Sequence, residues 1–177
     1  YYSRHDDSDH RFYCNMVIGL SPLPAIIRIA AKRQLIITVA ESCTGGMVSA
    51  ALTEIPGSSS VFERGYVTYS NAAKIDILSV SDVTLQKFGA VSEEVACQMA
   101  QGASRAAGAD IAVAVTGIAG PGGSANKPEG RVCFALFAGT LITRETINFG
   151  VLGRRNVREA ATKHALKLIF LYLQSVQ

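Results

Sequence analysis

The stretch LIITVAESCTGG, residues 35–46, begins as an apolar run and ends as a short polar segment with two glycines. The run at 35–40 is rich in β-branched and aliphatic residues, which is typical of a strand that is buried on both faces. The residues at 44–54 have the composition of a helix, so the polar segment lies between a strand and a helix. Ligands of α/β proteins bind beyond the carboxyl ends of strands, and we therefore expect a site at this turn.

The alternation of strands and helices continues along the chain. We expect further strands at 65–70, 109–117, 131–138 and 142–149, and helices at 25–34, 44–54, 71–78, from Ser92 onward and at 156–173. Continuous apolar strands separated by helices predict a sheet that is covered on both faces, whereas the last two strands follow each other directly and predict an antiparallel part. The predicted fold class is α/β, a three-layer α/β/α sandwich with a mixed, mostly parallel sheet.

Length and composition predict one domain of ordinary globular character. The 177 residues suffice for one core, and we expect a single domain at 21–177 that follows an N-terminal extension or tag-like arm at 1–20. The net charge of +3 is too small to indicate nucleic-acid binding, and the apolar segment at 16–31 is too interrupted to span a membrane. The four cysteines are far apart and lack neighbouring histidines, which argues against a zinc site and favours a reducing cytoplasm.

The polar turn offers a nucleophile and hydrogen-bond donors. Ser42 directly precedes the expected start of a helix. The free N–H groups of Thr44, Gly45 and Gly46 would then face an anion or a developing oxyanion. A serine nucleophile needs a base, and His164, the only histidine after residue 10, lies in the terminal helix with no motif around it. A lysine that is kept neutral by burial is the better candidate. The alternative interpretation is that Ser42 or Thr44 only caps the helix.

The segment RGYVTYSNAAK, residues 64–74, supplies a candidate base. Tyr69 ends a predicted strand, Asn71 is placed to cap the following helix, and Lys74 lies five residues beyond Tyr69. A tyrosine at this position could relay a proton or orient the lysine amine. Taken alone, such a segment is more often a strand end followed by a solvated lysine.

Two further segments suit a nucleotide. TGIAGPGG, residues 116–123, is neither the GxGxxG fingerprint nor a Walker A loop, but a glycine-rich turn after a buried strand is compatible with phosphate. GRRNVR, residues 153–158, places three arginines near a helix start, where they oppose the helix dipole. That placement indicates a use such as phosphate binding by a guanidinium group. A tight turn and a solvated helix face are the alternatives.

Together these segments resemble the CinA C-terminal domain family of competence/damage-inducible proteins, which includes the nicotinamide-nucleotide amidases. The matching runs are AESCTGG, FERGYVTYSNAAK, GAVSEEVA, AVAVTGIAGPGG with KPEG, and GRRNVR, in family order over about residues 35–173. The chain departs from the family pattern at Gly153, where an acidic residue is common, and at Glu129, which replaces a common apolar residue. Larger members carry a further N-terminal domain, so the few residues ahead of Leu35 predict the stand-alone form.

The resemblance implies hydrolysis of the carboxamide of nicotinamide mononucleotide to nicotinic acid mononucleotide and ammonia, in pyridine-nucleotide salvage. It places the family's nucleophile on Ser42, its general base on Lys74 and its assisting tyrosine on Tyr69, and it implies no cofactor and no metal. The expected partners are the nucleotide substrate and a second copy of the chain, a homo-oligomer with a dimer favoured, but no nucleic acid and no membrane. The implied substrate-binding residues are Glu41, Thr44, Gly45, Gly46, Asn71, Thr116, Gly117, Gly120 and Arg154.

Three other interpretations stay open from the residues. A non-catalytic nucleotide-binding or regulatory protein would keep the glycine loop and the arginines but would not need both Ser42 and Lys74. An amidase for another small amide would keep this pair but would not need Arg154. A cysteine hydrolase would use Cys43, which points away from the site if Ser42 faces it. The joint presence of Ser42 and Lys74 favours the enzyme.

Overall fold

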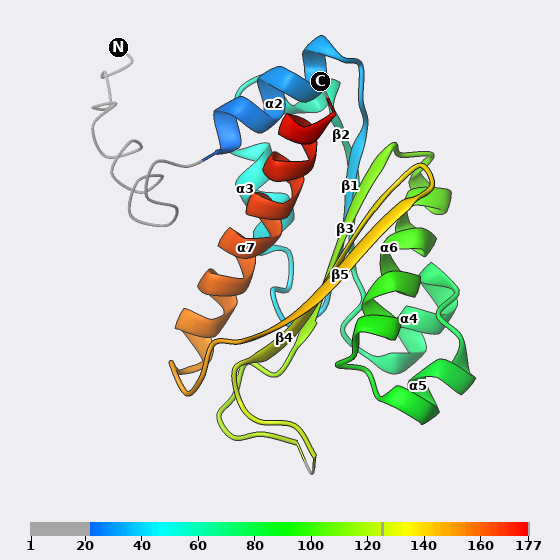
Figure 1. Ribbon diagram of the computed structural model, residues 1–177, viewed down its shortest axis with the longest axis vertical. Helices are drawn as coiled ribbons and strands as arrows, with labels where there is room; N and C mark the ends of the chain where they lie inside the picture. The colour runs from blue at the N-terminus through cyan, green and yellow to red at the C-terminus, as the bar shows by residue number, and fades with distance from the viewer. Residues whose placement is uncertain (1–21, 125, 177) are drawn as a thin grey trace, which may run out of the picture.

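The structure, a computed structural model, describes residues 22–124 and 126–176, which form a five-stranded sheet between two layers of helices (Figure 1). The strands are β1 (Ile37–Glu41), β2 (Phe62–Val67), β3 (Ile111–Gly117), β4 (Arg131–Ala138) and β5 (Leu141–Asn148). The helices are α2 (Leu23–Lys32), α3 (Met47–Thr53), α4 (Asn71–Leu78), α5 (Asp82–Phe88), α6 (Glu93–Ala107) and α7 (Arg154–Ser175), with a 3-10 turn η1 at Ser58–Ser60. The expected N-terminal extension at 1–20 lies outside the described residues.

The strand order is β2-β1-β3-β4-β5. β1 pairs in parallel with both β2 and β3, whereas β4 is antiparallel to β3 and β5 is antiparallel to β4. β5 therefore runs in the direction of β1, β2 and β3, and within the described ranges β4 alone runs the other way. The predicted three-layer α/β fold with a mixed sheet is confirmed.

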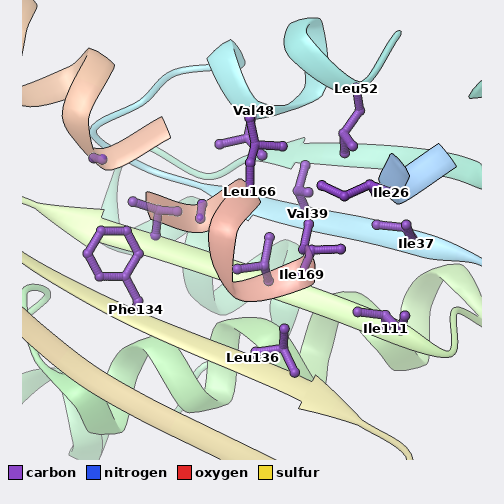
Figure 2. Close-up of a cluster of buried hydrophobic side chains, with 14 of the residues drawn as sticks. Ile26, Ile37, Val39, Val48, Leu52, Ile111, Phe134, Leu136, Leu166 and Ile169 are labelled. Carbon is purple, nitrogen blue, oxygen red and sulfur yellow. The ribbon is translucent and has the colours of Figure 1, made fainter. Parts of the chain in front are cut away.

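Alternate residues of the central strands supply two different cores, as the period of two in a strand requires. One face carries large side chains such as Val39 and Phe134, which pack against α2, α3 and α7 (Figure 2). The opposite face carries small residues such as Ala112 and Ala114, which belong to one buried cluster with side chains of α4, α5 and α6 (Figure 1). Small side chains let α6 approach the sheet closely, and α4, which carries the candidate base, packs on α6.

The close contact between α6 and α4 depends on a glycine. A Cβ atom at Gly102 of α6 would overlap the main-chain carbonyl of Leu78, the last residue of α4. Glycine has no Cβ, so the two helices meet backbone against backbone at this point. α4 is thereby held against α6, and its buried residues include Lys74.

Some element boundaries differ from the expected ones. α3 begins at Met47 rather than at residue 44, because Gly45 and Gly46 have positive φ values of 58° and 99° and keep the chain in a turn. Asn71 does not cap α4: the N-cap is Ser70, whose hydroxyl accepts the N–H of Ala73 at 3.1 Å. The short helix α5 has no counterpart among the expected elements. Over the described ranges, the helices are too short or too polar to cross a lipid bilayer.

Candidate active site

The carboxyl ends of β1 and β3 border a cavity of about 350 Å³. Its walls come from the β1–α3 turn, the end of the β2–α4 connection, the turn before α6, the loop after β3 and the first residue of α7. Among the expected site residues, those that line it are Ser42, Tyr69, Lys74, Thr116, Gly117, Gly120 and Arg154. The polar turn and the glycine-rich loop thus converge at one end of the sheet.

Ser42 and Lys74 meet in this cavity. Lys74 Nζ lies 3.1 Å from Ser42 Oγ, within hydrogen-bond distance, although the two residues are 32 positions apart. Ser42 is placed by its own main chain, since its N–H donates to the Val115 carbonyl at 2.9 Å as a continuation of the β1–β3 ladder. Parallel pairing of β2 with β1 then brings the start of α4, and with it Lys74, beside the serine.

The Lys74 amine lies in a site that favours its neutral form. The residue is only 1% exposed, and burial lowers the pKa of Lys74 to about 8. Besides Ser42, Nζ contacts the carbonyl oxygens of Thr68 at 2.8 Å and Tyr69 at 3.3 Å. A carbonyl can only accept, so the two N–H groups of a neutral amine satisfy these two oxygens. The remaining lone pair then faces the Ser42 hydroxyl, which is the geometry that proton abstraction requires.

Glu41 has a different place from the expected one. Its carboxylate accepts the N–H groups of Gly46, Val48 and Ser49 at 3.0, 3.1 and 2.9 Å and the hydroxyl of Ser49 at 2.8 Å. The side chain is fully buried and lies outside the cavity lining. The Glu41 carboxylate therefore accepts the donors at the N-terminus of α3, where a bound anion would otherwise lie. The structure does not support a contact between Glu41 and a substrate.

The expected anion site at the start of α3 is consequently occupied. The N–H of Gly46 donates to Glu41, and the N–H of Gly45 donates to the Ser42 carbonyl at 3.1 Å. Thr44 is buried outside the cavity lining, and its hydroxyl has no hydrogen-bond partner in the described part of the chain. The prediction that Gly45 and Gly46 present free N–H groups to an oxyanion is therefore wrong. A carboxylate of the chain takes the donor of Gly46, and a main-chain carbonyl takes that of Gly45.

Arg154 and Tyr69 meet at the mouth of the cavity. The Arg154 guanidinium donates to the Gly120 carbonyl and to the Tyr69 hydroxyl, both at 2.9 Å. In this arrangement the Tyr69 hydroxyl contacts Arg154, and only the main-chain carbonyl of Tyr69 contacts Lys74. Tyr69 thus orients the lysine through its backbone, while its side chain is 59% exposed. Asn71 is exposed and does not line the cavity.

The sequence reasoning did not assign Arg158, which holds the turn after Ser42. Its guanidinium donates to the carbonyl oxygens of Cys43 at 3.0 Å and Thr44 at 3.1 Å. Arg154 and Arg158 are four residues apart on α7 and therefore share one helix face, whereas Arg155 forms an exposed ion pair with Glu159. This spacing within GRRNVR was the available signal that two of the three arginines act together.

Cys43 and His164 take structural positions. Burial raises the pKa of Cys43 to about 12, so its thiol stays protonated near neutral pH and is a poor nucleophile. His164 Nε2 lies 2.8 Å from a carboxylate oxygen of Glu145, and its ring packs on Phe134. In the ranges 22–124 and 126–176, no three His, Cys, Asp or Glu side chains are grouped as they would be around a metal ion.

Residues 23–173 match the family described as CinA C-terminal domain. The chain is 51% identical over 137 residues to the nicotinamide-nucleotide amidohydrolase PncC of Escherichia coli K12, covering 76% of this chain and 82% of that protein. It is 46% identical over 155 residues to a CinA-like protein of Chlorobium limicola, covering 84% of this chain but only 36% of that longer protein.

Solved structures show the same relationship. The crystal structure of the competence/damage inducible protein CihA from Agrobacterium tumefaciens superposes with a TM-score of 0.82 at 47% sequence identity, covering 86% of this chain and 93% of that one. A competence damage-inducible protein A from Klebsiella pneumoniae gives a TM-score of 0.83 at 36% identity, covering 88% and 97%. Because the match extends over nearly all described residues in both sequence and fold, the chain belongs to the CinA C-terminal domain family.

Proposed function

We propose that this protein is a nicotinamide-nucleotide amidase that hydrolyses the carboxamide of nicotinamide mononucleotide to nicotinic acid mononucleotide and ammonia. The observation that carries the proposal is the 3.1 Å contact between Lys74 Nζ and Ser42 Oγ inside a cavity where burial lowers the pKa of the lysine. The relatives named nicotinamide-nucleotide amidohydrolase support the substrate class.

The proposed reaction has two steps that share one base. Neutral Lys74 takes the hydroxyl proton of Ser42 as Oγ attacks the carboxamide carbon, and the carbonyl oxygen becomes an oxyanion. The lysine ammonium then gives its proton to the departing nitrogen, so ammonia leaves and a nicotinoyl ester remains on Ser42. Lys74 next takes a proton from water, and hydroxide attacks the ester carbon. The proton returns to Ser42 Oγ as the ester bond breaks, and the carboxylic acid that forms releases its own proton to water to give the carboxylate product.

The lining of the cavity suits an anionic nucleotide with a flat ring. Arg154 is its guanidinium and Lys74 its amine, and the described residues that line it include no carboxylate. Aliphatic side chains from Val91 and Ile118 supply an apolar wall for a pyridine ring. The Arg154 guanidinium uses two of its five N–H groups on Gly120 and Tyr69, which leaves donors for a phosphate.

The direct test is ammonia release from nicotinamide mononucleotide by the purified protein, with nicotinic acid mononucleotide measured by chromatography. We expect release by the wild type and none by a folded Ser42→Ala variant. If the folded wild type releases no ammonia, the substrate assignment fails. Binding of the unreacted nucleotide in a calorimetric titration would then favour a nucleotide-binding protein, whereas release from free nicotinamide but not from the nucleotide would favour another amidase.

The proposed base makes the reaction pH-dependent. Only neutral Lys74 can take the serine proton, so kcat/KM should rise with pH and level off above a pKa of about 8. For one group with this pKa, kcat/KM at pH 6.5 is about 25-fold lower than at pH 8.5. This pH range lies above the second pKa of a substrate phosphate, about 6. The change in kcat/KM therefore reflects a titrating group of the enzyme rather than the substrate. A flat profile between these pH values would contradict the role of Lys74.

Arg154 is the proposed phosphate ligand. Arg154→Gln should raise KM for nicotinamide mononucleotide by about 10- to 100-fold, because a charge-assisted hydrogen bond contributes roughly 1.5–3 kcal/mol, and should change kcat by less. Arg155→Gln is the matched control, since Arg155 lies next to it but forms an exposed pair with Glu159. An unchanged KM in Arg154→Gln would place the phosphate elsewhere.

The expected homo-oligomer stays a prediction.

A further inference from the structure

The oxyanion of the proposed acyl transfer needs hydrogen-bond donors, and the N–H groups at the start of α3 already have an acceptor. The N–H groups of Gly46, Val48 and Ser49 at the start of α3 all donate to Glu41. These three N–H groups are therefore not free for an oxyanion next to Ser42, and a donor from a neighbouring element can contribute to its stabilisation. The end of β3 and the loop that follows it line the same cavity as the β1–α3 turn.

The register of β3 shows where its last N–H points. Val115 accepts the N–H of Ser42 at 2.9 Å, so the main-chain groups of Val115 face β1. Ile118 donates its N–H to Arg131 at 2.9 Å, so its main-chain groups face the side of β4. Main-chain groups alternate in direction along a strand, and Gly117 therefore faces the β1 side, as Val115 does.

β3, however, continues beyond the end of its neighbour β1. β1 stops at Glu41, and the Ser42 carbonyl, the next acceptor along this edge, receives the N–H of Gly45. Gly117 consequently lies beyond the end of β1, the strand that pairs with β3 on this side. Its N–H is directed toward the cavity that Ser42 and Gly117 both line. A Cβ at Gly117 would come within 2.7 Å of a Val132 methyl carbon and 3.0 Å of Cys43 Sγ, so glycine is required here for packing.

We propose that the main-chain N–H of Gly117 is an oxyanion donor for Ser42, an inference that rests on the proposed amidase function. When Ser42 Oγ adds to the carboxamide carbon, the C=O π electrons move to the oxygen, and the Gly117 N–H donates a hydrogen bond to it. When the C–N bond breaks, the carbonyl re-forms and the hydrogen bond weakens. The donor belongs to a buried strand, so it is held in place before the reaction.

The first test uses the wild-type chain labelled with ¹⁵N-glycine, treated with a small fluorophosphonate. Ser42 Oγ displaces fluoride, Lys74 takes the proton, and the phosphonyl oxygen takes the position of the oxyanion. We expect the amide proton of Gly117 to shift downfield on labelling, while those of Gly45 and Gly46 keep their positions because they already donate within the chain. A shift at Gly45 or Gly46 without one at Gly117 would overturn the proposal.

The second test removes the donor without adding a side chain, by incorporating glycolic acid at position 117 so that the N–H becomes an ester oxygen. Loss of one oxyanion donor typically costs about 100- to 1000-fold in kcat, and we expect a fall of that size with KM nearly unchanged. The same replacement at Gly139, in the turn between β4 and β5, is the control and should leave kcat within about 2-fold. Unchanged kcat and unchanged fluorophosphonate labelling in the 117 variant would overturn the proposal.

These readouts separate this inference from the proposed function. If the wild type reacts with the fluorophosphonate but does not hydrolyse nicotinamide mononucleotide, the substrate assignment fails, while slower labelling of the 117 variant still supports the Gly117 donor. If the folded wild type neither reacts nor hydrolyses the nucleotide, Ser42 is not a nucleophile and both proposals are wrong.

Discussion

Replacing Lys74 with methionine is expected to lower kcat for nicotinamide mononucleotide by about 10⁴-fold, the upper end of what a positioned general acid–base group contributes. Methionine retains most of the length and the apolar stem of the side chain, so it fills the same buried space, but it cannot take the serine proton. Ammonia release under saturating substrate measures the loss. A thermal unfolding curve shows whether the variant keeps its fold.

Lys163→Met is the matched control for this experiment, because Lys163 lies exposed on α7 and should tolerate the change. The carbonyls of Thr68 and Tyr69 lose a donor in Lys74→Met, so we expect a moderate destabilisation of roughly 1–3 kcal/mol as well. A variant that unfolds at nearly the wild-type temperature and keeps more than a few per cent of the activity would show that Lys74 is not the base.

Replacing Glu41 with alanine is expected to lower the free energy of unfolding by about 3–5 kcal/mol, because it leaves several buried donors without an acceptor. These are the N–H groups of Gly46, Val48 and Ser49 and the Ser49 hydroxyl. Urea denaturation measures the change. Glu41→Gln should cost less, since the amide oxygen still accepts hydrogen bonds, although its NH₂ group cannot.

Glu63→Ala serves as the control for the same measurement. Glu63 pairs with Arg64 on the surface, and exposed pairs contribute about 0–1 kcal/mol, so this variant should unfold almost as the wild type does. A loss below about 1 kcal/mol in Glu41→Ala would mean that water or a rearranged turn satisfies the start of α3. In that case the helix N-terminus would again be available to a substrate anion.

The main strands could be predicted because they are buried on both faces. β3 reads as an uninterrupted apolar run, and burial on both sides of the sheet is the physical cause of that pattern. α5 was missed because a seven-residue helix with one buried residue, Leu85, has almost no periodic signal. The boundary of α3 was misplaced because its start depends on two positive φ angles, which the composition of the turn does not reveal.

The sequence by itself determined the alternating α/β plan, the family motifs and the identity of Ser42, Lys74 and Arg154 as candidate site residues. Only the tertiary structure decided which of them meet. The parallel pairing of β2 with β1 brings Ser42 and Lys74, which are 32 positions apart in the chain, within hydrogen-bond distance. Burial at that place lowers the pKa of the amine. The tertiary structure also decided that Glu41 accepts the N–H groups at the start of α3. Any suitably placed anion satisfies those donors, and a carboxylate on the same chain is already held within reach.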